Sequence, residues 1–237
     1  MDAREKIELP ARRRIYLLRH GDVAYFDGQG RPFHPGTVPL TAAGRAQAEA
    51  AARELAAVPF DRAVSSDLPR CTETAGIVTA GRGLTVEARP ELREIQPGRL
   101  ADVPPDGLVA AFLGAFSGPV TRDTRFLAGE TFGSLADRVL ACLAELLADR
   151  GWKRLLVVAH GGVNRTILAH ALGAGLAGVG VLEQDPGCVN LLEVDDGGRF
   201  LVRLVNHTPY DAAKQGLEGT TMERLFLQYR AGGHRPR

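Results

Sequence analysis

Residues 15–25, IYLLRHGDVAY, carry an arginine and a histidine to the end of a short apolar run, which then turns at a glycine. Residues 154–168, RLLVVAHGGVNRTIL, repeat this arrangement: an apolar run ends in a histidine and two glycines, and a helical pattern follows. Short apolar runs bounded by glycine are typical of buried strands. Both stretches therefore predict a strand that presents cation-capable side chains at its carboxyl end.

Strand-like apolar runs recur along the 237 residues, and helical patterns separate most of them. This alternation predicts a mainly parallel sheet with helices on both faces. The expected fold class is α/β, a three-layer α/β/α sandwich. The last two strands, joined by DDGG at 195–198, are expected to form an antiparallel hairpin. The six predicted strands cover residues 14–18, 60–65, 84–88, 154–159, 188–194 and 199–206.

Two helices have clear signals in the sequence. Thr41 is expected to cap the alanine-rich helix that follows it. Residues 131–151 predict a long amphipathic helix that ends at Gly151. Its apolar face contains Phe132, Leu135, Val139, Leu143 and Leu146.

No linker or repeat divides the sequence, so residues 1–237 are expected to form a single domain. Residues 96–130 interrupt the alternation with glycines, prolines and a short apolar helix. We interpret this segment as a small cap inserted over one edge of the sheet. The last residues, AGGHRPR, are expected to form a frayed tail.

Composition and charge argue against several classes of protein. With 29 Lys and Arg against 28 Asp and Glu, the net charge of +1 gives no general attraction to nucleic acid or acidic membranes. Cys71, Cys142 and Cys188 lie far apart, which favours packing roles in a reducing compartment. The first residues do not resemble a secretory signal, and no apolar run is long enough to span a membrane. We expect a soluble cytoplasmic protein that binds neither nucleic acid nor membranes, with a homodimer as one possible assembly.

Four cation-capable side chains are expected to meet at one edge of the sheet. Arg19, His20 and His160 follow two predicted strands, and ligands of parallel α/β sheets bind at the carboxyl ends of the strands. In FDRAVSSDLPRCTETA, residues 60–75, a strand leads into a helix expected to begin near Ser66 or Asp67, with Arg70 in its first turn. An arginine beside a helix N-terminus favours an anion.

This combination suits phosphoryl transfer to nitrogen. A neutral imidazole is a nucleophile near neutral pH, and guanidinium groups bind phosphate oxygens and stabilise their charge. The leaving oxygen needs a proton, and Glu94, which follows the third predicted strand, is our candidate for the acid. Rival acids are Glu91, Asp102 and Glu130, and Glu94 could instead pair with Arg93 or Arg89.

The sequence resembles the histidine phosphatase superfamily, which includes cofactor-dependent phosphoglycerate mutases. The resemblance implies that His20 is the phosphorylated nucleophile, that Arg19, Arg70 and His160 hold the phosphoryl group, and that Glu94 is the acid/base. Because the sequence shows no carboxylate or His/Cys cluster with metal-ligand spacing, we expect a metal-independent phosphomonoesterase with no cofactor. The matching motifs, in the order of the family, are LLRHG at 17–21, PLTAAGRAQA at 39–48, SSDLPRCTETA at 65–75, ELREI at 91–95 and VVAHGG at 157–162.

The sequence departs from the family beside the nucleophile and after the acid. Val23 and Phe26 stand where the family has polar residues, and GRLAD at 98–102 replaces its usual Gly-x-Trp-Glu-Gly turn. These departures predict an apolar rim, which would favour phosphate esters with apolar or aromatic leaving groups; packing of the cap is the competing explanation. Gly161, Phe26 and Thr131 are further candidates for substrate binding, although Thr131 could simply cap its helix.

Three functions remain open at this stage. The first is a phosphatase that hydrolyses small-molecule phosphate esters through a phosphohistidine. The second is phosphoryl transfer of the phosphoglycerate mutase type, which the unmatched residues 96–106 disfavour. The third is a non-catalytic regulatory module that binds phosphate.

Overall fold

A computed structural model describes residues 11–27, 29, 31–99, 102–116 and 118–231. Six strands form one sheet in the order β3-β2-β4-β1-β5-β6. Strands β1 to β4 run parallel to one another, whereas β5 is antiparallel to β1 and β6 is antiparallel to β5. The mainly parallel sheet and the terminal hairpin are therefore confirmed. The strands are β1 Arg12–Arg19, β2 Arg62–Ser65, β3 Val86–Ala88, β4 Arg154–Ala159, β5 Val189–Asp195 and β6 Phe200–His207.

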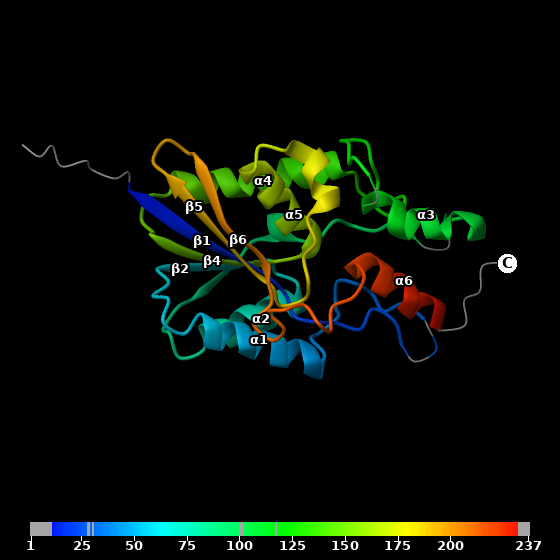
Figure 1. Ribbon diagram of the computed structural model, residues 1–237, viewed down its shortest axis with the longest axis horizontal. Helices are drawn as coiled ribbons and strands as arrows, with labels where there is room; N and C mark the ends of the chain where they lie inside the picture. Colours follow the sequence, from blue (N-terminus) through cyan, green and yellow to red (C-terminus); the bar gives the residue numbers. More distant parts are fainter. Residues whose placement is uncertain (1–10, 28, 30, 100–101, 117, 232–237) are drawn as a thin grey trace, which may run out of the picture.

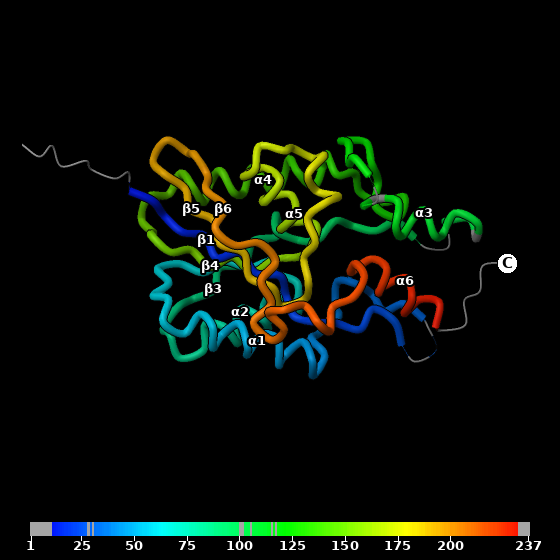
Figure 2. The backbone as a smooth tube through the Cα atoms, viewed as in Figure 1, coloured from blue at the N-terminus to red at the C-terminus, as the bar shows by residue number. Residues whose placement is uncertain are grey.

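Helices cover both faces of the sheet, as the three-layer prediction requires (Figure 1). Helices α1 (Ala42–Glu54) and α2 (Pro69–Thr79) lie on one face, and α4 (Phe132–Ala148) and α5 (Gly161–Ala171) lie on the other. The tube in Figure 2 shows the chain crossing from one layer to the other through the strands. Short 3-10 helices occupy Pro90–Leu92, Pro105–Gly107, Gly114–Phe116 and Gly175–Val181.

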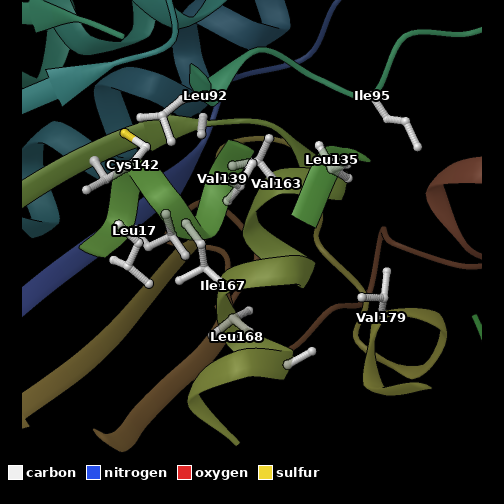
Figure 3. Packing of buried hydrophobic residues seen from close by; sticks show 14 of the residues in the cluster. Leu17, Leu92, Ile95, Leu135, Val139, Cys142, Val163, Ile167, Leu168 and Val179 are labelled. Atoms are coloured by element: carbon white, nitrogen blue, oxygen red, sulfur yellow. The ribbon is translucent and has the colours of Figure 1, made fainter. Parts of the chain in front are cut away.

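Alternation along the central strands divides the core between the two helical layers. Ile15 and Leu17 of β1 pack in the cluster that includes α4 and α5, whereas Tyr16 and Leu18 pack in the cluster with α1 and α2. Successive side chains of a strand point to opposite faces, so a continuous apolar run is needed when both faces are covered. Figure 3 shows the α4–α5 side, where residues such as Leu17, Val139 and Ile167 interdigitate.

Local signals explain where three of the helices begin or end. The Thr41 hydroxyl accepts a hydrogen bond from the Gly44 N–H (3.0 Å), which confirms the predicted cap of α1. Helix α2 begins at Pro69 rather than near Ser66 or Asp67, because a residue preceding proline, here Leu68, adopts extended backbone. The prediction for α4 is also slightly wrong: the helix ends at Ala148, before Gly151, because Asp149 already adopts extended backbone (φ −70°, ψ 118°).

Two further helices lie beyond the carboxyl ends of the parallel strands. Helix α3 (Leu108–Leu113) belongs to segment 96–130, and α6 (Thr221–Ala231) follows the hairpin in the sequence and packs against α3 (Figure 1). Helix α6 was not predicted from the sequence. Of the tail predicted to be frayed, residues 232–237 lie outside the described residues. Within the described part of the chain, every helix is too short or too polar to cross a membrane.

Candidate active site

The His20 ring is buried directly after β1, at the carboxyl edge of the sheet. Its Nδ1 atom lies 2.7 Å from the carbonyl oxygen of Gly21. Because a carbonyl oxygen only accepts, this hydrogen-bond network assigns the ring proton to Nδ1 and the lone pair to Nε2. The Nε group of Arg70 donates to that Nε2 atom over 3.2 Å. The ring therefore presents its nucleophilic nitrogen to an arginine.

Burial and neighbouring charges keep both site histidines neutral. Burial, followed by the positive charges of Arg70 and Arg19, holds the pKa of His20 well below its ordinary value of 6.5. Burial and the same cationic surroundings also hold the pKa of His160 well below 6.5. A neutral imidazole keeps its lone pair, so His20 is a competent nucleophile around neutral pH.

Arg19 and Arg70 are held by backbone oxygens and keep donors for a ligand. The Nη1 group of Arg19 donates to the Gln184 carbonyl (2.5 Å) and to the Thr221 hydroxyl (3.1 Å). Its Nε atom is buried and has no hydrogen-bond partner among the described residues. The Nη1 group of Arg70 donates to the Pro35 carbonyl (2.6 Å). A buried, unpaired guanidinium donor is costly, and an anion beside it would satisfy it.

His160 stands at the N-cap position of α5, beside the nucleophile. The centroids of the His20 and His160 rings lie 5.1 Å apart. The Nε2 atom of His160 lies 2.9 Å from the Ser66 hydroxyl and 3.4 Å from the Cys71 sulfur. His160 is fully buried and is not among the residues that line the cavity described below. The structure thus places it against His20, behind the cavity wall.

Glu94 lies in the loop after β3, and its side chain reaches the first turn of α5. Its Oε2 accepts from the Gly162 N–H (3.0 Å), and its Oε1 accepts from the Ile95 N–H (3.0 Å). The two arginines considered as alternative partners of Glu94 pair with other carboxylates: Arg93 donates to Asp67, and Arg89 pairs with Glu87. Glu94 lines the cavity, whereas the rival acids, which are all described, do not: Glu91, Asp102 and Glu130.

Gly161 lies between the guanidinium group of Arg19 and the carboxylate of Glu94. A Cβ atom at this residue would be 3.6 Å from Nε of Arg19 and 3.8 Å from Oε2 of Glu94. The missing side chain leaves this space to a ligand, which fits the predicted role of Gly161 in substrate binding. The group that the sequence placed together is therefore together in the structure: His20, Arg19, Arg70, His160 and Glu94.

A cavity of about 730 Å³ opens over His20. Its base contains His20, Arg19, Arg70 and Glu94. The walls come from the loop after β1, segment 96–130 and helix α6. Apolar wall residues include Val23, Tyr25, Phe26, Phe33, Ile95, Phe112, Phe116, Phe126, Leu127, Met222 and Leu225.

Of the predicted rim residues Phe26 and Thr131, only one lines the cavity, and the site also contains residues that were not predicted. Phe26 lines the cavity, but Thr131 does not; its hydroxyl accepts from the Ser134 N–H (3.1 Å) and caps α4. Sequence reasoning missed Thr221 and Gln184, which hold Arg19, together with the whole α6 wall. The spacing of apolar residues over 222–229 is a helical signal that could have identified the helix itself.

Comparison with known proteins gives several relatives of this chain. It is 32% identical over 161 residues to a protein of Salmonella paratyphi A named probable phosphoglycerate mutase, covering 67% of this chain and 74% of that protein. It is 29% identical over 190 residues to the adenosylcobalamin/alpha-ribazole phosphatase of Escherichia coli, covering 77% and 90%. A solved mycobacterial glucosyl-3-phosphoglycerate phosphatase, in complex with vanadate (VO3), superposes with a TM-score of 0.66 at 27% identity, covering 82% and 98%.

The alpha-ribazole phosphatase of Shigella flexneri superposes with a TM-score of 0.67 at 25% identity, covering 81% of this chain and 96% of that one. The model of the histidine phosphatase superfamily, branch 1, matches residues 15–207. This range runs from β1 to the end of β6 and includes His20, Arg70, Glu94 and His160. With its sequence match and the observed site geometry in agreement, the chain belongs to the histidine phosphatase superfamily.

Proposed function

We propose that this chain is a phosphatase that hydrolyses small-molecule phosphomonoesters through a phosphohistidine at His20. The observation that carries the proposal is the state of the imidazole: it is buried and neutral, its Nε2 lone pair lies beside Arg70, and the positive charge of Arg19 also acts on the ring. A nucleophilic nitrogen between two cations is suited to attack on a phosphate ester.

The first half-reaction transfers the phosphoryl group to His20. The lone pair of Nε2 forms a bond to phosphorus, and the bond from phosphorus to the ester oxygen breaks. The protonated carboxyl of Glu94 gives its proton to the leaving oxygen, which departs as an alcohol. Arg19 and Arg70 hold the three non-bridging oxygens, whose charge they stabilise.

The second half-reaction restores the enzyme with water. The Glu94 carboxylate accepts a proton from water as the water oxygen bonds to phosphorus, and the bond between nitrogen and phosphorus breaks. Inorganic phosphate leaves, His20 is neutral again and Glu94 is again protonated. The balance needs no oxidant, reductant or second substrate.

The proposal includes independence from metal ions and a cytoplasmic location. The two buried arginines supply the positive charge that a metal ion would otherwise bring to the phosphoryl oxygens. The three cysteines are unpaired and buried, which favours a reducing compartment. The substrate is expected to be a small phosphate ester.

A mutase-type phosphoryl transfer is the second candidate, because one relative carries the name of a phosphoglycerate mutase. The two activities differ in the fate of the phosphoryl group: a phosphatase releases it to water, whereas a mutase returns it to another hydroxyl. Incubation with 3-phosphoglycerate and a bisphosphoglycerate primer separates them, since only the mutase forms the 2-phosphate isomer faster than free phosphate.

The test of the main proposal combines turnover with labelling. Protein mixed with a radiolabelled phosphomonoester should retain label after alkaline quenching and lose it after acid quenching, as a phosphoramidate does. His20→Ala should abolish both label and turnover. His170→Ala is the matched control, since that histidine is exposed near the end of α5 and should behave as wild type. Turnover by His20→Ala at the wild-type rate would overturn the mechanism, and phosphate binding without any turnover would favour the regulatory module.

A further inference from the structure

The cavity is much more apolar above its base than phosphate binding requires. Aromatic side chains enter it from separate segments: Phe26 from the loop after β1, and Phe112, Phe116 and Phe126 from segment 96–130. Helix α6 adds Met222 and Leu225 on its inner face. Cavities lined in this way bind ligands largely through apolar area, with a few polar groups fixing orientation.

The apolar walls are packed against one another. The Phe112 ring lies 5.5 Å from the Phe226 ring and 5.5 Å from the Tyr229 ring, between centroids. The Tyr229 ring lies 5.6 Å from that of Phe26. Segment 96–130, α6 and the loop after β1 thus share one aromatic cluster. This cluster holds the walls in place, so the cavity is preformed.

The cavity offers little free positive charge beyond the base. Arg165 donates to Glu183 (2.8 Å), and Arg224 donates to Asp185 (2.8 Å), so each is paired with a carboxylate. Arg99 is exposed, and water screens its charge. A second anionic group on the substrate would therefore lose hydration without gaining a matched cation.

We infer that the leaving group of the substrate is uncharged and apolar, about the size of one or two rings, and binds between Phe26, the phenylalanines of segment 96–130 and the Met222–Leu225 face of α6. This inference rests on the proposed phosphatase activity and names its substrate class. Burial of one ring against these walls should raise kcat/KM about tenfold or more.

The test uses alkyl esters only, so that the chemistry of the leaving oxygen stays nearly constant. The three substrates are 2-phenylethyl phosphate, ethyl phosphate and 3-phosphoglycerate. Wild type should prefer the phenylethyl ester over the ethyl ester about tenfold or more, and should disfavour 3-phosphoglycerate. The informative quantity is the ratio of kcat/KM for the phenylethyl ester to that for the ethyl ester.

Helix α6 supplies a matched pair of variants. Leu225 faces the cavity, whereas Leu227 on the same helix is 62% exposed and lies outside it. Leu225→Gln should bring the ratio close to one, and Leu227→Gln should leave it at the wild-type value. Phe26→Asn tests a wall residue from another segment, so the inference stays testable if Leu225→Gln fails to fold.

Each outcome separates the inference from the proposed function. Absence of hydrolysis for every ester would overturn the phosphatase proposal itself. Hydrolysis that depends on His20 but shows no preference for the phenylethyl ester, or prefers 3-phosphoglycerate, would overturn only the inference. An unchanged ratio in both Leu225→Gln and Phe26→Asn would also overturn it, because the walls would then only pack segment 96–130 onto the sheet.

Discussion

A methyl group at residue 162 should disable the acid without removing it. The Cβ of an alanine there would lie 2.5 Å from Oε1 of Glu94, while the Gly162 N–H donates to Oε2 of the same carboxylate. The Glu94 side chain is flexible, so it can swing away, but an ordinary contact requires a displacement of roughly 1 Å. A displacement of this size at a reacting group costs roughly a hundredfold in rate.

The loss in Gly162→Ala should depend on the leaving group. An alkyl phosphate needs a proton on its leaving oxygen, so kcat/KM should fall roughly a hundredfold. p-Nitrophenolate departs with little assistance, so p-nitrophenyl phosphate should be much less affected. We specify kcat/KM because it reports the steps up to cleavage of the ester bond, before Glu94 acts again on water. The free energy of unfolding should change by less than about 1 kcal/mol, since alanine suits a helix better than glycine.

Two variants control this experiment. Glu94→Gln cannot donate a proton and should show the same dependence on the leaving group. Gly21→Ala should instead destabilise the fold, because its Cβ would lie 2.2 Å from the backbone oxygen of Gly44, which cannot rotate away. If Gly162→Ala and Glu94→Gln both cleaved alkyl phosphates at the wild-type rate, Glu94 would not be the acid. If only Glu94→Gln were impaired, the close approach at Gly162 would not be what positions it.

Three other predictions concern Arg19, the buried histidines and metal ions. Thr221→Val removes the acceptor of one of the hydrogen bonds that Nη1 of Arg19 donates, so kcat should fall about tenfold with little change in KM, and Thr221→Ser should restore it. The unfolded chain binds protons that the buried imidazoles of His20 and His160 do not, so the free energy of unfolding should fall as pH decreases from 6.5 toward 5. The fall should reach up to about 1.4 kcal/mol per pH unit for each histidine. Urea denaturation that gave a constant free energy of unfolding over this range would contradict their neutral burial. Activity should survive exhaustive chelation and be inhibited by vanadate, whereas loss on chelation that magnesium or zinc reversed would contradict metal independence.

The part of the site that could be predicted lies at the ends of strands. Apolar runs located β1 and β4, and parallel strands end at the same edge of a sheet, so Arg19, His20 and His160 had to meet. Arg70 was predictable for a related reason, since Pro69 marks the first turn of α2. These inferences need only local pattern and the geometry of a parallel sheet. They required no knowledge of long-range packing.

The remaining part depends on contacts between segments far apart in the sequence. Gln184 and Thr221 hold Arg19 from positions more than 160 residues away, and nothing near them in the sequence marks that role. The apolar spacing over 222–229 could have predicted the helix α6, but its packing on Phe112, which makes it a wall of the cavity, depends on a contact between distant segments. Val23 was predicted from the sequence as a rim residue, and it does line the cavity, but its packing with Val38 and Leu40 could not be predicted.

The two His-Gly turns look alike in the sequence, but their glycines are required for different reasons. At Gly21 the constraint comes from packing, because the turn after β1 touches the first turn of α1, and Gly44 meets Asp22 equally closely. At Gly161 and Gly162 the constraint comes from chemistry, because a side chain would fill the space between Arg19 and Glu94 or push the carboxylate aside. The first turn therefore fixes where His20 stands, and the second keeps open the space in front of it. In the proposed mechanism the phosphoryl group enters that space to reach Nε2, so a side chain at residue 161 or 162 should impair the reaction without disturbing the turn that holds His20.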